Sequence, residues 1–307
     1  MKKGLFFIVL FSLYLFAGES YHKRQLNFFA TINGYTVNFD LITIFLLRGE
    51  EITIKTEQSA EHYKILSFKR TFKTISENEW KYKPDPVSDM GYIILKNANE
   101  QMKIQYMLLT PLTRVKNGWI NGYHIGRYPK KALRGNKLYN KPRGLIEVNS
   151  KNKNMLLTPH FKLSQFLCKQ VASYPKYIVL REAILYKLEY ILEALNRFGY
   201  AANTFYVMSG YRTPYYNKKI GNVKYSRHVY GDAADIFVDT NHDQNMDDLN
   251  RDGKINFDDV KVLINIVEKM AEQKKYESYI GGLGRYHQNR SHPGFIHTDV
   301  RGYKARW

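Results

Sequence analysis

The spacing of apolar residues changes partway along this 307-residue chain, and this change limits the fold more than any other feature. In the first third, apolar Tyr35, Val37 and Phe39 alternate with polar residues after Asn33-Gly34, a pair typical of a hairpin turn. Similar strand patterns lie at residues 51–56, 92–95 and 102–108, the last two separated by a polar turn at 97–99. We expect a mainly β domain, for which a sandwich is one arrangement, over residues 21–130. It carries no chemical motif that we recognise.

Residues 131–160 break this pattern with proline, glycine, lysine and asparagine, which predicts a connecting segment. Beyond it, apolar residues recur at helical spacing over residues 184–195, with Gly199 as a candidate helix C-cap, and again over residues 260–270. Short strand patterns lie at residues 206–208 and 236–238. This mixture predicts an α+β domain over residues 161–307.

The first twenty residues have the composition of a secretory signal peptide. Met1-Lys2-Lys3 is followed by a largely apolar run of twelve residues from Leu5 to Phe16 and then by small residues. The apolar run is short for a membrane span, although an uncleaved anchor is the alternative. We therefore expect an exported protein of the periplasm or cell envelope.

The net charge of +19 favours an anionic partner, unless it serves only solubility. Export excludes nucleic acid as a sensible partner and favours an anionic wall or membrane surface. The oligomeric state cannot be deduced from the sequence.

Three residues in the C-terminal half have the donor atoms of a metal site. His228 and Asp235 are separated by six residues that include Gly and two Ala, and Asp235 leads into an apolar strand. Further on, His297 lies in a strand-like alternation with Asp299 on the same face. Three nitrogen and oxygen ligands suit a catalytic zinc, which keeps a fourth position open for water. The single cysteine, Cys168, cannot build a cysteine zinc site and is expected to be a buried thiol.

Residues 208–307 resemble the zinc D-Ala-D-Ala carboxypeptidases, which belong to the LAS metallopeptidases. The matching pieces are SGYRTP at 209–214, SRHVYGDAAD at 226–235, GGLGRY at 281–286, FIHTDVR at 295–301 and RW at 306–307. The resemblance implies a LAS-type α+β fold, an antiparallel sheet with helices. It also implies zinc ligation by His228, Asp235 and His297.

The same resemblance implies roles in substrate binding. The arginine of the first motif, Arg212, would face the substrate and stabilise charge on the carbonyl or bind a carboxylate. The alternative is a surface arginine in a turn before Pro214. Tyr211 and Ser226 are further candidates, although Ser226 could be a plain turn serine.

The general acid/base has two candidates. One branch of the family has Glu three residues before the last ligand, where this chain has Gly294. The carboxypeptidase branch has His five residues before it, which here is His292, and we favour it as the acid/base. The rival is Asp299, which could instead hold the tautomer of His297. We expect His287 to be a loop residue.

An acidic insertion at residues 239–259 contains an EF-hand-type loop from Asp248 to Asp259. Gly253 holds loop position 6, where the turn is sharp, and an Asp at position 12 resembles dockerin loops. The expected calcium ligands are Asp248, Asn250, Asp252, Lys254 and Asp259. Candidates for extra ligands, at the same spacing but without the glycine, are Asp239, Asn241 and Asp243. The alternative is an acidic loop that binds nothing.

Together these features predict an exported zinc metallopeptidase that hydrolyses D-amino-acid-containing bonds in peptidoglycan stems. It would act as a DD-carboxypeptidase or a cross-link endopeptidase. The alternatives are a non-catalytic wall-binding protein that kept the fold, and a peptidase acting on secreted proteins.

Overall fold

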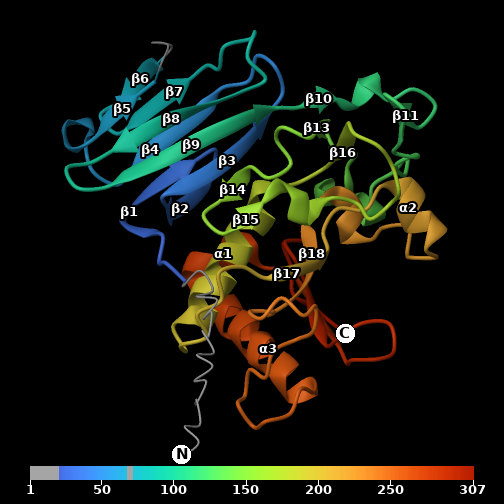
Figure 1. The fold of residues 1–307 in the computed structure, drawn as a ribbon. Coiled ribbons are helices and arrows are strands. Elements are labelled where there is room, and N and C mark those ends of the chain that lie inside the picture. The colour runs from blue at the N-terminus through green and yellow to red at the C-terminus, as the bar shows by residue number, and fades with distance from the viewer. Residues whose placement is uncertain (1–20, 68–71) are drawn as a thin grey trace, which may run out of the picture.

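The computed structural model describes residues 21–67 and 72–307. Two sheets of the N-terminal third lie at one end, and the main helices with a third large sheet lie at the other (Figure 1). The expected signal peptide, residues 1–20, lies outside the described residues. Within the described ranges, no helix has both the length and the apolar character needed to cross a membrane.

The first sheet has the strand order β2-β1-β4-β7-β6. Its strands are β1 (Gln25–Ile32), β2 (Tyr35–Phe39), β4 (Ile52–Thr56), β6 (Phe72–Ser76) and β7 (Glu79–Tyr82). The hairpin predicted at Asn33-Gly34 is confirmed, because both residues have positive φ, 47° and 88°, and join the antiparallel strands β1 and β2.

The second sheet has the order β3-β9-β8-β5, in which β3 runs parallel to β9. Its strands are β3 (Leu41–Leu46), β5 (Lys64–Leu66), β8 (Met90–Lys96) and β9 (Gln101–Leu108). The two sheets share an apolar core, in which the rings of Tyr82 on β7 and Tyr106 on β9 lie 5.9 Å apart.

Short strands fill the stretch between these sheets and the first long helix. They are β10 (Thr110–Pro111), β11 (Trp119–Ile120), β12 (Tyr123–His124), β13 (Gly144–Val148), β14 (Leu156–Thr158), β15 (Phe161–Lys162) and β16 (Lys176–Ile178). Residues 131–160, expected as a connecting segment, thus contain β13 and β14. The polar composition conceals β13, whose Leu145, Ile146 and Val148 are buried.

The C-terminal part mixes helices with a sheet of order β17-β18-β20-β19-β21, so its α+β character is confirmed. The helices are α1 (Glu182–Asn196), α2 (Pro214–Lys219) and α3 (Phe257–Ala271). The strands are β17 (Tyr206–Ser209), β18 (Ala233–Phe237), β19 (Gly282–Tyr286), β20 (Phe295–Asp299) and β21 (Ala305–Arg306). All pairings are antiparallel except that of β19 with β21.

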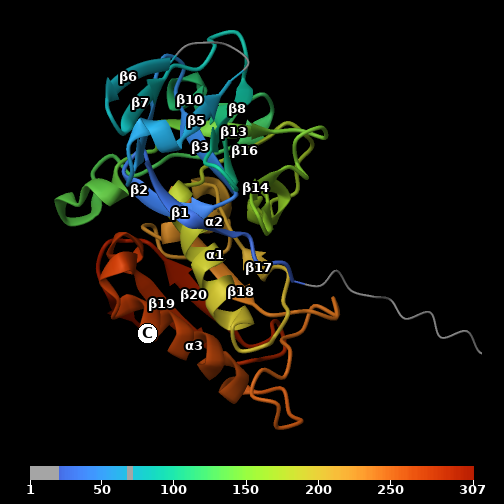
Figure 2. The ribbon, with the colours of Figure 1, turned by 90° about the vertical axis from the view of Figure 1, so that its left-hand side faces the viewer.

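Helix α1 lies between the N-terminal sheets and the C-terminal sheet (Figure 2). Its Tyr186 hydroxyl donates to the Thr43 carbonyl on β3, whereas its Lys187 ammonium donates to the Asp299 carbonyl on β20. Almost every side chain of α1 is therefore buried. Helix α1 therefore links the β-rich N-terminal part of the molecule to strand β20, which carries His297.

Candidate metal centre

The central pair of strands in the C-terminal sheet brings two predicted ligands together. Asp235 on β18 and His297 on β20 are direct cross-strand partners. His228 precedes them in a 3-10 turn that ends at Gly231. Gly231 has φ +70°, and a Cβ there would lie 2.3 Å from the Val179 carbonyl oxygen. Only glycine fits this turn, which returns the chain from His228 to β18.

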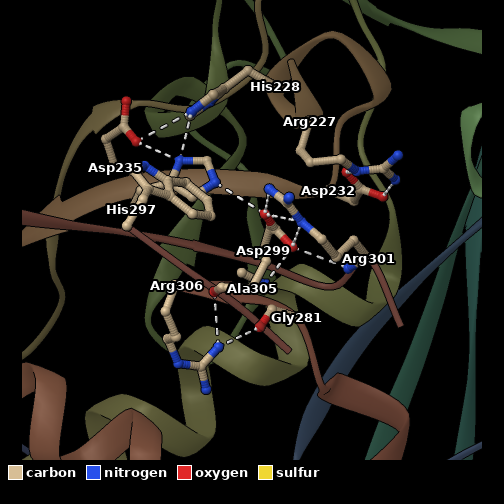
Figure 3. A network of polar contacts seen from close by, with 12 residues as sticks. Arg227, His228, Asp232, Asp235, Gly281, His297, Asp299, Arg301, Ala305 and Arg306 are labelled. Carbon is tan, nitrogen blue, oxygen red and sulfur yellow. Dashed lines mark hydrogen bonds and ion pairs between the residues drawn. The ribbon is translucent and has the colours of Figure 1, made fainter. Parts of the chain in front are cut away.

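The three predicted ligands converge (Figure 3). His228 Nε2 lies 3.1 Å from Asp235 Oδ1 and 3.1 Å from His297 Nδ1, and these last two atoms are 2.8 Å apart. All three side chains are buried. In the described part of the chain, this is the one group of three or more His, Cys, Asp or Glu residues placed to hold a metal ion.

The remaining polar atoms of the three side chains are already occupied. His228 Nδ1 donates to the Gly210 carbonyl at 2.7 Å, and His297 Nε2 lies 3.1 Å from Asp299 Oδ2. The other oxygen of Asp235 accepts from Arg212 Nη2 at 2.6 Å. Each side chain thus presents one free donor atom to a common centre, which fits a zinc site with three protein ligands.

The electrostatics of the centre also suit a cation. Burial lowers the pKa of His228 and so favours its neutral, metal-binding form. Burial opposes the charged form of His297 as well, but hydrogen bonds to Asp235 and Asp299 outweigh it and raise that pKa. Burial alone would raise the pKa of Asp235, yet its histidine neighbours hold it well below the usual range. Negative charge is therefore concentrated around the two imidazoles.

Asp299 supports the ligand His297 from behind the centre. It is fully buried and accepts from Arg301 Nε at 2.9 Å and from the Gly282 amide at 2.8 Å. A Cβ at Gly281 would lie 1.8 Å from the Asp299 carbonyl oxygen, so the backbones pack in direct contact. Asp299 does not line the cavity described next, and its 3.1 Å contact with His297 Nε2 is the one that the tautomer-holding alternative predicts.

A cavity of about 730 Å³ opens onto the metal centre. Two predicted substrate-binding residues, Arg212 and Ser226, line it. The Arg212 guanidinium is held in place, since Nε donates to Ser209 Oγ at 2.8 Å while Nη2 donates to Asp235. The prediction for Tyr211 is corrected, because this side chain is buried in the core with its hydroxyl 2.8 Å from that of Tyr128.

The structure does not bring His292 to the cavity of the metal centre. Its ring nitrogens lie 2.7 Å from Asn289 Nδ2 and 2.8 Å from the Pro293 carbonyl oxygen. It lines a separate open groove between residues 243–245 and 288–293. The other histidine of this region, His287, stacks on Phe257 at 3.8 Å between ring centroids.

Sequence reasoning missed the residues that support the ligand turn. Arg227 and Asp232 form a buried ion pair beside His228, and Arg227 also donates to the Leu138 carbonyl. The Trp307 ring lies 5.2 Å from that of His297. Two features of the sequence pointed to these residues. Asp232 is a carboxylate without an assigned role between His228 and Asp235, and Trp307 closes the last family motif.

The acidic insertion forms two turns with the same hydrogen bonds. Asp248 accepts from the amides of Asp252 and Gly253, and Asp239 accepts in the same way from the amides of residues 243 and 244. Gly253 has φ +81° and Gln244 has φ +64°, so the turn at Asp239 adopts the same left-handed conformation although it has no glycine. Asp259 is buried and caps α3 by accepting from the backbone amides of residues 249 and 256.

Comparison with known proteins supports the interpretation of the metal centre. Residues 159–260, about one third of the chain, match a family model described as peptidase M15. The match includes His228 and Asp235 and ends before His297. M15 peptidases depend on zinc, so the match indicates a metallopeptidase. Searches of curated proteins and of solved structures found no match.

Proposed function

We propose that this protein is an exported zinc metallopeptidase that hydrolyses D-amino-acid-containing bonds in peptidoglycan peptide stems. It would act as a DD-carboxypeptidase or as a cross-link endopeptidase with a LAS-type catalytic domain. The observation that carries the proposal is the convergence of His228, Asp235 and His297, each with its other polar atom already bonded. The family match over residues 159–260 supports the same chemistry.

The residues around the centre have distinct tasks in this reaction. Zinc held by the triad would activate water and polarise the scissile carbonyl. Arg212 would hold Asp235 in place and stabilise the negative charge that develops on the carbonyl oxygen. The aromatic rings of Tyr286, Phe295 and Trp307 line the cavity and would exclude bulk water around the bound peptide.

We retain His292 as the proposed acid/base. Its present position requires the turn at residues 288–293 to move towards the cavity when substrate binds. Catalytic contacts often tighten only in the substrate complex, so the distance in the free protein does not exclude the role. His292 is half-buried and its ring lines an open groove, which leaves it room to move.

Location and organisation form part of the same proposal. Residues 1–20 would direct export to the periplasm or cell envelope, residues 21–130 would form an accessory β domain, and residues 161–307 the catalytic domain. A net charge of +19 would hold the protein on an anionic wall or membrane surface. The accessory domain would leave the catalytic cavity free, since the described residues that line that cavity all lie from 133 onward.

Calcium binding at the acidic insertion is a second component of the proposal. The supporting observations are the EF-hand spacing and the left-handed Gly253 at loop position 6. The ligands would be the side chains of Asp248, Asn250, Asp252 and Asp259 with the carbonyl of Lys254. The ion would order the segment that leads into α3.

Digestion of purified sacculi tests the proposed activity. We expect zinc-loaded protein to release products that mass spectrometry identifies as cleaved at a D-amino-acid bond, and the His297→Ala variant to release none. Cleavage of casein but not of sacculi would instead favour the peptidase of secreted proteins. Tight binding to sacculi without any cleavage would favour the wall-binding protein.

A further inference from the structure

The charges around the metal-centre cavity do not balance. Three of its arginines have acidic partners. Arg212 pairs with Asp235, and Figure 3 shows the pairs of Arg227 with Asp232 and of Arg301 with Asp299. All three pairs are partly or fully buried, and all three arginines line the cavity. Each guanidinium is neutralised by its partner. The three pairs together therefore add no net charge to the cavity.

Two more cations line the same cavity without such compensation. Arg134 and Lys224 are exposed, and the ion pairs found in residues 21–67 and 72–307 include neither of them. Asp235 is the one carboxylate among the described residues that line the cavity. A bound zinc ion would add two further positive charges. The cavity therefore has a positive electrostatic potential, which a neutral peptide would not complement.

The position of Arg134 is set by a segment anchored to the ligand turn. Arg134 itself has φ +50° and is followed by Gly135 at φ +70°, so two consecutive residues adopt left-handed backbone. Strained backbone of this kind in a non-glycine residue concentrates at functional sites. The segment is held where the Leu138 carbonyl accepts from Arg227 and where the Tyr139 ring lies 4.2 Å from that guanidinium.

Lys224 reaches the cavity from the loop between α2 and the ligand turn. Its ammonium lies 5.5 Å from the centroid of the Tyr225 ring, and both residues line the cavity. Arg134, by contrast, lies outside the region matched by the family model, which begins at residue 159. The match therefore includes Lys224 and does not reach Arg134.

We propose that Arg134 and Lys224 form an anion-binding subsite in the wall of the metal-centre cavity, which binds a carboxylate of the peptide substrate. This inference rests on the proposed peptidase function and adds a preference for acidic peptides. The cavity volume of about 730 Å³ suits a short peptide bound next to the metal centre. A guanidinium and an ammonium bind a carboxylate through charge-assisted hydrogen bonds, which a neutral amide cannot match.

The carboxylate can come from an acidic side chain or from the end of the chain, and three synthetic peptides separate these sources. They are acetyl-D-Glu-L-Ala-D-Ala-D-Ala, the same peptide with D-Gln, and the D-Glu peptide with an amidated end. Titration calorimetry measures their affinities for zinc-loaded protein at low salt, and hydrolysis is followed separately. We expect about tenfold tighter binding of at least one carboxylate over its amide counterpart.

The Arg134→Gln/Lys224→Gln double variant should reduce this ratio to about one and retain its zinc. Lys269→Gln, a change of one exposed lysine on α3 outside the cavity, should keep the wild-type ratio. Which peptide loses affinity on amidation identifies the bound carboxylate. Equal affinities in wild-type protein, or a ratio that persists in the double variant, would overturn the subsite.

The hydrolysis measurement keeps this inference distinct from the proposed function. Selective binding without hydrolysis of any of these peptides or of sacculi would uphold the subsite and refute the peptidase. Hydrolysis with no preference between acid and amide would uphold the peptidase and refute the subsite. The selectivity should also weaken as salt is raised, because the cations are exposed.

Discussion

The metal centre and the acidic insertion contain similar donor atoms but are built in different ways. In the metal centre, His297 lies 62 residues from Asp235 and 69 from His228, and sheet register brings the three together. In the insertion, the proposed calcium ligands lie within twelve residues, and their carboxylates accept from backbone amides of the same loop. The first site depends on the tertiary fold, whereas the second depends on its own turns.

This difference predicts different consequences of metal binding. The ligand atoms of the metal centre are already oriented, because every other polar atom of the triad has a partner. The negatively charged carboxylates of the insertion can come close together only around a bound cation, so the cation should order the loop. Zinc should therefore control activity, and calcium should mainly control stability.

The largest effect should come from removing a ligand of the metal centre. We expect about one zinc per chain in wild-type protein, and loss of both zinc and hydrolysis in His228→Ala and His297→Ala. Elemental analysis and the sacculus assay measure the two quantities. His287→Ala provides a matched control, because His287 stacks on Phe257 outside the cavity. Full zinc retention in both ligand variants would refute the assignment.

The next effect concerns proton transfer and separates His292 from Asp299. His292→Ala should keep its zinc and lose about 10²- to 10⁴-fold in turnover, the contribution of a positioned acid/base. Asp299→Asn should instead weaken zinc binding by about 10- to 100-fold, because it no longer accepts from His297 and Arg301 as a carboxylate.

Zinc titration against a fluorescent chelator and turnover at saturating zinc measure these two quantities. If His292→Ala turns over normally while Asp299→Asn is inactive with zinc bound, the two roles must be exchanged. Such a result would show that the turn at residues 288–293 has no part in the reaction.

A hundredfold effect is expected at Arg212. Arg212→Ala should lower turnover by about 10²-fold or more at saturating zinc, because it removes a positive group aimed at developing charge. Arg212→Lys should recover little, since one ammonium cannot reproduce the bonds to both Ser209 and Asp235. Arg48→Ala breaks an exposed ion pair far along the chain and should leave turnover unchanged. Wild-type turnover in Arg212→Ala would mean that Arg212 is only a turn residue.

The smallest effect should be the stabilisation by calcium. A hundredfold excess over the dissociation constant contributes about 2.7 kcal/mol, or roughly 5–10 °C in Tm for a chain of this size. The rise should disappear in Asp248→Ala and Asp252→Ala with zinc retained, and persist in Asp258→Ala, whose carboxylate pairs with Lys261. Calorimetric melting curves in chelator and in calcium measure it. A melting curve that is unchanged by millimolar calcium would show that the insertion binds no calcium.

Much of the architecture was open to prediction because it depends on local pattern. The Asn33-Gly34 hairpin, the helices α1 and α3 and the strands around them follow from turn chemistry and apolar spacing. The strand β13 was missed, because its apolar residues lie within a stretch rich in lysine and asparagine. Helix α1 follows from apolar residues at helical spacing, but that spacing does not show that contacts on both sides bury almost all of the helix.

The sequence by itself singled out the three proposed metal ligands, because a motif preserves residue types at given spacings. Only the tertiary structure decided which residues share the cavity. It excluded Tyr211 by burying it, set Asp299 behind His297, and placed Arg134 in the cavity wall. The physical reason is that these outcomes depend on packing and pairing between segments far apart in the chain. Residue type and spacing carry no information about such contacts.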